Sequence, residues 1–445
     1  MSQAERSFNF AFHGTLWASA YLALILAPLA VLLVGSVPPG TTFAWDFAVA
    51  LGFSALSLMG SMFLLTARFQ WTTRAFGIDI IYFFHRWVAL IAFVLLLGHP
   101  VILLGVEPLL IEYLKPNAPW HMLAGAAALL AVILQVATSI WRKYIGLEYD
   151  TWRRLHALLA MTAIVLAVAH IVGVNYYIEA PWKHELWFAF AASWIVLMLY
   201  LRLVRPWRIS RRPYRVADIK AERGDAWTLT LEPVGHAGLR FLPGQFVWLC
   251  LWHSALAMRE HPFSISSSAE QPQRLSFTIK KLGDFTARLS QVTVGQAACL
   301  DGPFGAFSID RYPGAPGYVF VAGGVGIAPI LGMLKTLADR GDERPVWLFY
   351  AYKNLDYLTA YDQLQALQSR VKLNLVVILN DAPADWTGER GLLSEGILRR
   401  HLPDNYRDLE YFLCGPTVMT AAAERDLERM GISVRHIHTE LFEMA

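Results

Sequence analysis

Six long apolar stretches occupy the first half of the chain, near residues 12–34, 45–67, 81–106, 121–141, 156–176 and 185–204. A helix needs about 20 apolar residues to cross a hydrocarbon core about 30 Å thick, and it satisfies its own backbone hydrogen bonds on the way. Each stretch is long enough, so we expect six membrane-spanning helices. The first stretch exceeds the apolar core of about 7–15 residues usual for a signal peptide, and no convincing cleavage site follows it.

The pattern changes to short runs after Pro206. Alternating runs at 214–219, 227–232, 246–251 and 275–280 predict strands of an antiparallel β-barrel. From Gly317, short buried strands at 318–322, 346–350, 373–379 and 411–413 alternate with helical segments such as 330–338, which predicts a parallel, doubly wound α/β lobe. The expected fold class is therefore a multidomain membrane protein, with a six-helix transmembrane bundle over 1–208, an antiparallel β-barrel over 209–312 and an α/β doubly wound nucleotide-binding domain over 313–445.

Composition supports this division of the chain. The 445 residues are 56% hydrophobic and 16% charged, against about 25% charged in ordinary soluble domains, and the first 205 residues hold only 21 of the 73 charged residues. These values exclude a wholly soluble enzyme and a disordered chain, and three cysteines cannot form a disulfide scaffold of this length. The net charge of +3, without a dense basic run, gives no reason to expect nucleic acid as a partner.

Basic residues predict the orientation, because cytoplasmic loops retain Lys and Arg. They gather between stretches two and three, between four and five, and after stretch six, at Arg68, Arg74, Arg142, Lys143, Arg153, Arg154, Arg202, Arg205, Arg208, Arg211 and Arg212. The alternate connections carry mostly acids. We therefore expect a multi-pass protein of the plasma (inner) membrane with both termini and the soluble half in the cytoplasm.

Two pairs of histidines lie within the apolar stretches. His85 and His99 are in the third stretch and His156 and His170 in the fifth, and each pair is 14 residues apart. Fourteen residues return to nearly the same helix face about 21 Å further along. Because both stretches run outward from the cytoplasm, His85 lies level with His156, and His99 with His170. Two facing imidazoles at two depths are what bis-histidine ligation of two haems requires.

Two other interpretations of these histidines stay open. They could be polar core side chains that bond to neighbouring helices, as we expect for the unmatched His13, His121 and His184. A zinc site is also possible, although two levels suit two large planar ligands better than one small ion.

Several short motifs follow one another in the soluble half, and each alone is a weak signal. Residues 323–329 read Gly-Gly-Val-Gly-Ile-Ala-Pro between a strand and a helix, where glycines and free helical N–H groups favour a dinucleotide phosphate. The others are Leu-Pro-Gly-Gln-Phe at 242–246, His-Pro-Phe-Ser at 261–264, Gly-Asp-Phe-Thr at 283–286, Gly-Pro-Phe-Gly at 302–305 and Cys-Gly-Pro at 414–416.

In this order the motifs resemble those of the ferredoxin–NADP reductase module. Their fusion behind six spans with two histidine pairs resembles the NADPH oxidase and ferric reductase superfamily, over nearly the whole chain. The resemblance implies a six-span di-haem flavocytochrome b whose barrel binds FAD and whose α/β domain binds NAD(P)H, in a prokaryotic-type form without regulatory domains. No calcium-binding loop is found, so we expect constitutive activity.

The resemblance also assigns residues by position. It implies flavin contacts at His261, Pro262, Phe263 and Ser264, a pyrophosphate turn at Gly283 and Thr286, nicotinamide-dinucleotide contacts at Gly323, Gly324, Gly326, Pro329, Gly415 and Pro416, and haem ligands at His85, His99, His156 and His170. Cys414 beside the nicotinamide and Phe442 over the flavin are the catalytic candidates, although three residues follow Phe442 where the oxidase pattern ends on the aromatic residue. Lys353, after the strand at 346–350, could pair with a 2′-phosphate, which would weakly favour NADPH, or could be a solvated loop lysine.

The predicted function is transfer of electrons from cytoplasmic NAD(P)H through FAD and two b-type haems to a small outside acceptor, most simply dioxygen, giving superoxide. The outer connections are short, so we expect no obligatory protein partner; membrane lipid surrounds the bundle. Lys115, His121, Lys183 and His184 near these connections either attract an anionic acceptor or anchor the membrane interface. A ferric-chelate reductase with the same electron path is the alternative, and a haem sensor or carrier without turnover is a third hypothesis.

Overall fold

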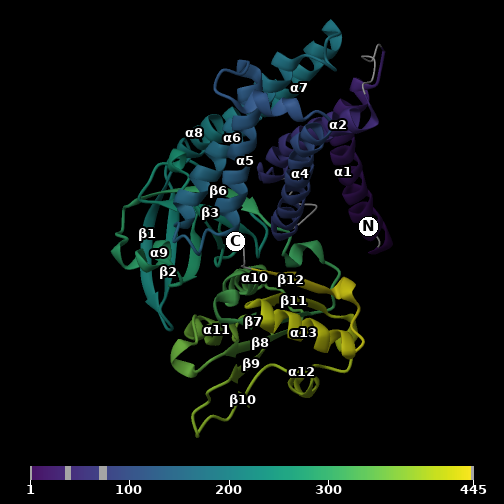
Figure 1. Cartoon of the computed structure of the whole chain (residues 1–445). Coiled ribbons are helices and arrows are strands. Elements are labelled where there is room, and N and C mark those ends of the chain that lie inside the picture. Colours follow the sequence, from purple (N-terminus) through teal and green to yellow (C-terminus); the bar gives the residue numbers. More distant parts are fainter. Residues whose placement is uncertain (1–2, 36–41, 70–77, 442–445) are drawn as a thin grey trace. The chain divides into compact units, whose positions relative to one another are not determined.

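The computed structural model describes residues 3–35, 42–69 and 78–441 (Figure 1). The chain divides into two compact units, residues 1–206 and 207–445. The secondary structure described in the first unit is helical, and the second unit contains two β-sheets.

Six helices of the first unit, among the described residues, are long and apolar enough to cross a membrane. They are α1 (Gln3–Leu32), α2 (Phe43–Thr66), α4 (Ile78–Val106), α5 (Trp120–Ile140), α6 (Tyr149–Val174) and α7 (Pro181–Leu199). They confirm the six expected spans. Two helices begin well before the expected positions. Helix α1 begins at Gln3, nine residues before 12. Helix α6 begins at Tyr149, seven residues before 156, because the polar turn that holds Arg153 and Arg154 is already helical.

Local sequence explains where several of these helices begin and end. The Thr42 side chain accepts a hydrogen bond from the Trp45 amide at 3.2 Å and caps α2. Asn175 ends α6 in a left-handed conformation, with φ of 53°, and Pro181 occupies the first turn of α7. A π-helical segment, η2 (Tyr200–Val204), and the short helix α8 (Arg205–Ser210) follow α7.

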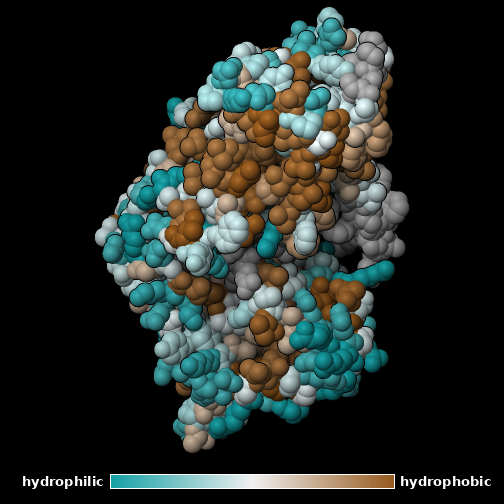
Figure 2. Space-filling view, viewed as in Figure 1, coloured by the Kyte–Doolittle hydropathy of each residue, from teal (hydrophilic) through white to brown (hydrophobic). Residues whose placement is uncertain are grey.

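Antiparallel pairs organise the helical unit: α2 packs along α4, and α5 packs along α6. Small side chains line the interior, including Ala131, Val132 and Ala163. Large apolar side chains point outward instead; Val94 and Val101 on α4 are 64% and 66% exposed. Figure 2 shows hydrophobic side chains over most of the visible face of this unit, as a lipid-facing bundle requires.

The first sheet of the second unit is antiparallel and curled. Its order is β4-β3-β6-β1-β2-β5. The strands are β1 (Tyr214–Glu222), β2 (Ala226–Pro233), β3 (Phe246–Leu251), β4 (His261–Ser264), β5 (Leu275–Lys280) and β6 (Ala297–Phe304), with the one-turn helix α9 (Asp284–Ala287) after β5. Alternate side chains, such as Leu229, Leu249 and Phe277, form its core.

The second sheet is parallel, in the order β10-β9-β8-β7-β11-β12. Its strands are β7 (Tyr318–Gly323), β8 (Val346–Tyr352), β9 (Leu373–Leu379), β10 (Glu389–Arg390), β11 (Glu410–Cys414) and β12 (Ile437–Glu440), and its helices are α10 (Ile327–Arg340), α11 (Tyr361–Leu367), α12 (Glu395–His401) and α13 (Thr417–Arg429). Residues on the two faces of β7 enter two separate cores, Phe320 with α10 and Val321 with α13. The expected fold class is thus confirmed.

Helix α10 ties the two sheets of the second unit together. The buried Thr336 hydroxyl accepts from the Ala269 amide at 2.9 Å. Arg340 bonds Glu270 at 2.6 Å and holds both carboxylate oxygens of Asp310. Gly332 lets the helix approach the Ile265 carbonyl, which a Cβ would meet at 2.5 Å. These contacts join the barrel and the α/β lobe along one helix.

The contact between α2 and α7 depends on the absence of a side chain at Gly60. A Cβ there would lie 2.5 Å from Nε1 of Trp194. We expect Gly60→Ala to destabilise the bundle by about 1–3 kcal/mol, the usual cost of overpacking, and to lower the thermal unfolding midpoint in detergent. Gly105→Ala on α4 is the control, because nothing lies within 4 Å of its Cβ position. Equal midpoints for the two variants would contradict this account of the packing.

Candidate functional site

Two histidine pairs face each other between α4 and α6. The ring centroids of His85 and His156 are 6.3 Å apart, with 65° between the ring planes. Those of His99 and His170 are 6.4 Å apart, with 72° between the planes. The structure therefore brings together the same partners that the spacing of 14 residues predicts.

Backbone carbonyls of neighbouring helices orient the second pair. His99 Nδ1 lies 2.8 Å from the Ala48 carbonyl on α2, and His170 Nδ1 lies 2.9 Å from the His121 carbonyl on α5. A carbonyl only accepts, so each Nδ1 carries the proton and each Nε2 keeps its lone pair.

Glycines make these two approaches possible. A Cβ at Gly52 would lie 3.1 Å from His99 Nδ1, and one at Gly125 would lie 2.7 Å from His170 Nδ1. Each glycine comes four residues after the carbonyl that accepts the bond, Gly52 after Ala48 and Gly125 after His121. Neither glycine was expected to belong to the site, and the only signal in the sequence is this spacing relative to a histidine on another helix.

In the first pair, side chains orient His156. His156 Nδ1 lies 3.2 Å from the Ser139 hydroxyl, and its Nε2 lies 3.2 Å from Nε2 of Gln135. Trp152 donates to the same hydroxyl at 3.3 Å. His85 Nδ1 is buried and has no hydrogen-bond partner in the part of the chain that is described.

Among the described side chains of the first unit, His121 and His184 are not paired in this way. The His121 ring contacts Trp120 edge-on at 5.6 Å, and His184 Nδ1 lies 3.4 Å from Oδ1 of Asn175. The His13 side chain falls outside the described residues. Across the described ranges, no three His, Cys, Asp or Glu side chains gather as metal ligands, so the ligand sets on offer are the two pairs.

Arg202 is a residue that the sequence analysis counted only as part of a basic stretch. It lies in the π-helical turn η2, and its charge interacts with His156. π-Helical turns often occur at functional sites. Next to it, Arg205 donates to the carbonyls of Ala67 and Arg68, at 2.5 and 3.3 Å, and fixes this end of α7 against α2. The positive end of the bundle is therefore on the side of the His85–His156 pair.

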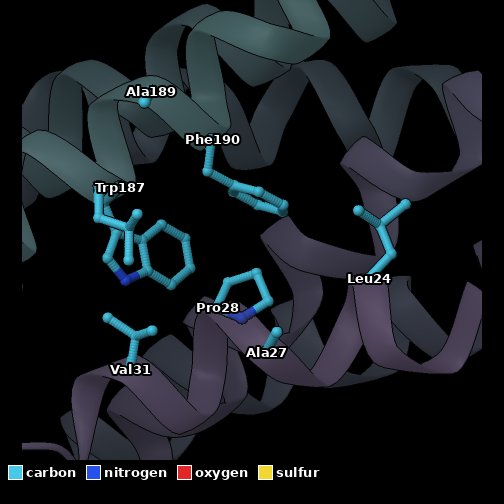
Figure 3. A pocket seen from close by; sticks show the side chains of 8 residues that line it. Leu24, Ala27, Pro28, Val31, Trp187, Ala189 and Phe190 are labelled. Carbon is cyan, nitrogen blue, oxygen red and sulfur yellow. The ribbon is translucent and has the colours of Figure 1, made fainter. Parts of the chain in front are cut away.

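A cavity of about 300 Å³ separates α1 from α7 (Figure 3). Its lining consists of apolar and aromatic residues, namely Leu24, Ala27, Pro28, Val31, Leu186, Trp187, Ala189 and Phe190. None of the predicted site residues lines it.

Strand β4 holds the predicted flavin residues. It pairs antiparallel with β3, so that Pro262 lies opposite Trp248, and the Ser264 side chain is turned inward. The Ser264 hydroxyl is buried without a hydrogen-bond partner among the described residues, a condition that a bound polar ligand would relieve.

An aromatic cluster beside β4 was not expected. Phe285 stacks on Phe263, with centroids 5.7 Å apart, and lies 4.2 Å from the His261 ring. Trp252 closes the cluster at 5.3 Å from Phe285. Strand β4 is therefore bordered by aromatic rings, one of which comes from the motif at 283–286.

The predicted pyrophosphate turn uses its threonine internally. Thr286 Oγ1 accepts from the amides of Leu282 and Gly283, at 2.8 and 3.0 Å. This hydroxyl therefore shapes the turn, and the Gly283 amide is already bonded. The assignment of this turn to phosphate stays a prediction.

The predicted nucleotide residues meet at the point where the order of the parallel sheet reverses. Strand β7 ends at Gly323 and its neighbour β11 ends at Cys414, with Cys414 paired to Ala322. A Cβ on Gly326 would lie 2.1 Å from the Cys414 carbonyl oxygen, so the two turns pack backbone against backbone. Ligands of doubly wound sheets bind at this position. Pro329 lies in the first turn of α10, and Gly415 and Pro416 lead into α13.

Tyr350, on β8, forms a hydrogen bond with the glycine turn and was not expected to belong to the site. Its hydroxyl lies 3.2 Å from the Gly324 carbonyl and 3.1 Å from the Thr359 carbonyl. Burial raises the pKa of Tyr350 well above its ordinary value, so the hydroxyl stays protonated and can donate. Gly324 itself has φ of 56°, which favours glycine.

Cys414 is fully buried, and its burial raises the pKa of the thiol well above the usual range, with Glu440 as a second cause. The thiol is therefore neutral and is not a nucleophile. Lys353 is 73% exposed, and its Nζ lies 4.0 Å from the Asp381 carboxylate. Phe442 lies outside the described residues, beyond β12.

Comparison with known proteins matches three successive parts of the chain. A ferric reductase like transmembrane component matches residues 51–167, an FAD-binding domain residues 213–312 and an oxidoreductase NAD-binding domain residues 320–425. The first match includes His85, His99 and His156.

Curated relatives match about half of the chain. The glycine betaine monooxygenase reductase subunit of Chromohalobacter salexigens is 29% identical over 53% of this chain and 65% of its own length. The propane 2-monooxygenase reductase component of Rhodococcus jostii is 31% identical over 51% of this chain and 62% of its own length. The chain thus spans less than two thirds of either relative. The crystal structure of the Amycolatopsis cytochrome P450 reductase GcoB is 23% identical, with a TM-score of 0.46 over 52% of this chain and 69% of that one.

Together the fold and these matches define an oxidoreductase with FAD- and NAD-binding domains behind a multi-pass membrane domain. More particularly, a ferric reductase-like transmembrane domain followed by these two domains is the architecture of NADPH oxidases and ferric reductases. The expected resemblance is confirmed at this level.

The close approach at Gly326 generates a prediction. Gly326→Ala would force the 323–326 turn away from the Cys414 carbonyl, and we expect it to weaken binding of NADH and NADPH about tenfold or more, as a loss of about 1.4 kcal/mol would. Calorimetric titration of the purified protein measures this change. Gly314→Ala is the control, since nothing lies within 4 Å of its Cβ position. Unchanged binding by the Gly326 variant would show that the turn does not receive the dinucleotide.

Proposed function

We propose that this chain transfers electrons from cytoplasmic NAD(P)H across the plasma (inner) membrane to a small acceptor on the other side. In this proposal the β-barrel holds FAD, and each of the two histidine pairs holds one b-type haem. The observation that carries it is the geometry of the histidine pairs, because it occurs twice and at two levels of the same two helices.

The distance between the rings would suit one iron held between the two imidazoles. With a metal–nitrogen bond of about 2.0 Å and a nitrogen about 1.15 Å from its ring centre, the two centroids would be about 6.3 Å apart. The observed distances are 6.3 and 6.4 Å. At His99 and His170 the proton on Nδ1 leaves Nε2 available as a ligand, which also fits.

When bound, FAD would take a hydride from the nicotinamide and release electrons singly to the haems, which carry one electron each. The chain's own part is to hold these groups. Ser264 offers a buried, unpartnered hydroxyl to the flavin, and Phe263 offers an aromatic face. The turns at Gly326 and Cys414 offer a close backbone approach to the dinucleotide. The fully buried Cys414 side chain packs at this turn.

Charge supports the direction of transfer. The arginines near the His85–His156 pair, including Arg202 and Arg205, mark the cytoplasmic end by the positive-inside rule. The His99–His170 pair then lies toward the outside, close to the acceptor.

The charges at the outer end favour dioxygen over an anionic ferric chelate. Lys115 forms an ion pair with Glu112. Lys183 is 1% exposed, and its Nζ donates to the Leu32 carbonyl at 2.8 Å. Neither lysine is thus an exposed, uncompensated charge for an anionic acceptor, and the carboxylates at this end outnumber the lysines: Asp46, Glu107, Glu112, Glu179 and Glu185. A neutral acceptor is indifferent to this excess of negative charge, whereas an anion is repelled.

Ferric-chelate reduction by the same electron path is the second candidate, and the match to a ferric reductase like transmembrane component favours it. A haem sensor or carrier without turnover is the third. The two experiments below separate these three functions.

Haem binding and reduction give the first test. We expect the purified protein to contain two low-spin b-type haems that become reduced under anaerobic conditions when FAD and NADPH or NADH are added. His99→Leu or His170→Leu removes one ligand of a pair, and we expect it to remove one haem and nearly all outward transfer while flavin reduction persists.

His184→Leu is the matched control, because His184 is near the same end but bonds only Asn175 among its described hydrogen-bond partners. It should keep both haems. Bound haem that stays oxidised with excess NAD(P)H would leave only the sensor or carrier hypothesis, and a protein that binds no haem would refute the proposal.

The acceptor gives the second test. If dioxygen is the acceptor, superoxide dismutase abolishes the aerobic reduction of added cytochrome c, and the rate changes little with salt. Anaerobic reduction of ferric-EDTA, an anion, should be slow and should accelerate with ionic strength as the negative end is screened. Fast ferric-EDTA reduction at low salt, together with cytochrome c reduction that superoxide dismutase does not suppress, would favour the ferric reductase instead.

A further inference from the structure

The environment of the histidines repeats with the same spacing as the histidines themselves. On α5, the carbonyl of His121 accepts a hydrogen bond from His170, and Gly125 leaves room for the His170 ring. Fourteen residues further along α5, the equivalent positions are Gln135 and Ser139, and both contact His156. A hydroxyl therefore stands at one level where a glycine stands at the other.

The hydrogen bonds of Ser139 can be assigned by counting donors and acceptors. Its hydroxyl has one proton, which is donated to the Gln135 carbonyl at 2.6 Å. One lone pair accepts from Trp152 Nε1 at 3.3 Å. The other faces His156 Nδ1 at 3.2 Å and can only accept, so His156 Nδ1 must carry the proton.

A second contact gives the same assignment independently. The Gln135 amide nitrogen lies 3.2 Å from His156 Nε2 and donates its proton, so Nε2 must hold the lone pair. Gln135 would have to give up this contact if a metal took the same lone pair.

We propose that Ser139 is a positioning residue that holds His156 with its proton on Nδ1 and sets how strongly Nε2 donates to the iron. This inference rests on the proposed function, since it concerns the haem at the His85–His156 pair. Among the described residues, three of the four histidines have an Nδ1 partner, and Ser139 is the one partner that is a side chain. The electron donation of His156 can therefore be changed by a single substitution.

The direction of the effect follows from the chemistry of the ligand. A hydrogen-bond acceptor on Nδ1 makes imidazole more basic, which stabilises the oxidised iron and lowers its reduction potential. Loss of the acceptor should therefore raise the potential of that haem. The haem at the His99–His170 pair keeps its carbonyl acceptors and should not change.

The experiment is an anaerobic redox titration of the full-length protein, followed by the haem absorbance. Ser139→Ala is expected to raise the midpoint potential of one haem and to leave that of the other unchanged. The expected rise is up to about 59 mV, which for a one-electron couple is a tenfold change in the reduction equilibrium. Ser139→Thr keeps the hydroxyl and should restore the potential of the unmodified protein.

Thr138→Ala is the matched control. Thr138 lies on the same turn of α5, and its hydroxyl bonds the carbonyls of Leu134 and Gln135, at 2.7 and 3.2 Å, without contacting a histidine. It should leave both potentials unchanged.

Trp152→Phe tests the sign of the effect. It removes the competing N–H donor while keeping a ring beside His156, whose centroid is 5.2 Å from that of Trp152. The Ser139 hydroxyl then becomes a better acceptor, so the potential of the same haem should fall. A purely structural role of Ser139 would not give opposite shifts for these two variants.

The outcomes separate this inference from the function on which it rests. If the unmodified protein binds no haem, the proposed function fails. Suppose instead that the unmodified protein binds two haems. If Ser139→Ala then has the same potentials as the unmodified protein, or if Ser139→Ala and Thr138→Ala shift the potential equally, only the inference on Ser139 is overturned. If Ser139→Ala loses its haem, the absence of a downward shift in Trp152→Phe overturns the inference, and a downward shift supports it.

Discussion

The helical half of this chain is organised by the need of each buried imidazole for a hydrogen-bond partner where water is absent. An unpaired polar group in hydrocarbon costs several kcal/mol, so an acceptor on a neighbouring helix stabilises a buried histidine. Among the described residues, His85 Nδ1 is the exception, since it has no such partner. His99 and His170 use the second lone pair of carbonyls that already serve helices α2 and α5. This requires close contact with those helices, which Gly52 and Gly125 allow. The antiparallel packing of α2 with α4 and of α5 with α6 provides that contact.

The reductase half uses close backbone approach for another purpose. At the edge of the parallel sheet, Gly326 lets its turn touch the Cys414 carbonyl, and the fully buried Tyr350 holds Gly324 from below. The polar groups there belong to the main chain, and their position depends on neighbouring strands of one sheet. In the reductase half and at the His99–His170 pair, main-chain atoms therefore set the geometry, and glycine is the residue that gives access to them. At the other pair, side chains hold His156 instead.

Much of the fold could be predicted because helices and strands depend on the length and spacing of apolar residues along the sequence. Apolar length gave the six helices, and the strands at 246–251, 275–280 and 373–379 have the predicted bounds. The pairing of the histidines followed from a spacing of 14 residues on helices that run in the same direction. What could not be predicted depends on how helices rotate against one another. Ser139 has no signal of its own, since its meaning comes from His156 on the next helix. The roles assigned to Phe442, Lys353 and the flavin residues stay predictions.

At the end of the bundle that we propose faces outward, the surroundings of two lysines matter more than their residue type. By sequence, Lys115 and Lys183 could attract an anion, but one is paired with Glu112 and the other is buried against the Leu32 carbonyl. A buried ammonium held by a carbonyl ties the start of α7 to the end of α1, so its function here is structural. At this end of the bundle, neither lysine is thus an exposed, unpaired charge that would balance the carboxylates other than Glu112. Such an end repels an anionic reactant but also expels an anionic product, and a neutral acceptor that becomes an anion on reduction, as dioxygen does, benefits from both effects.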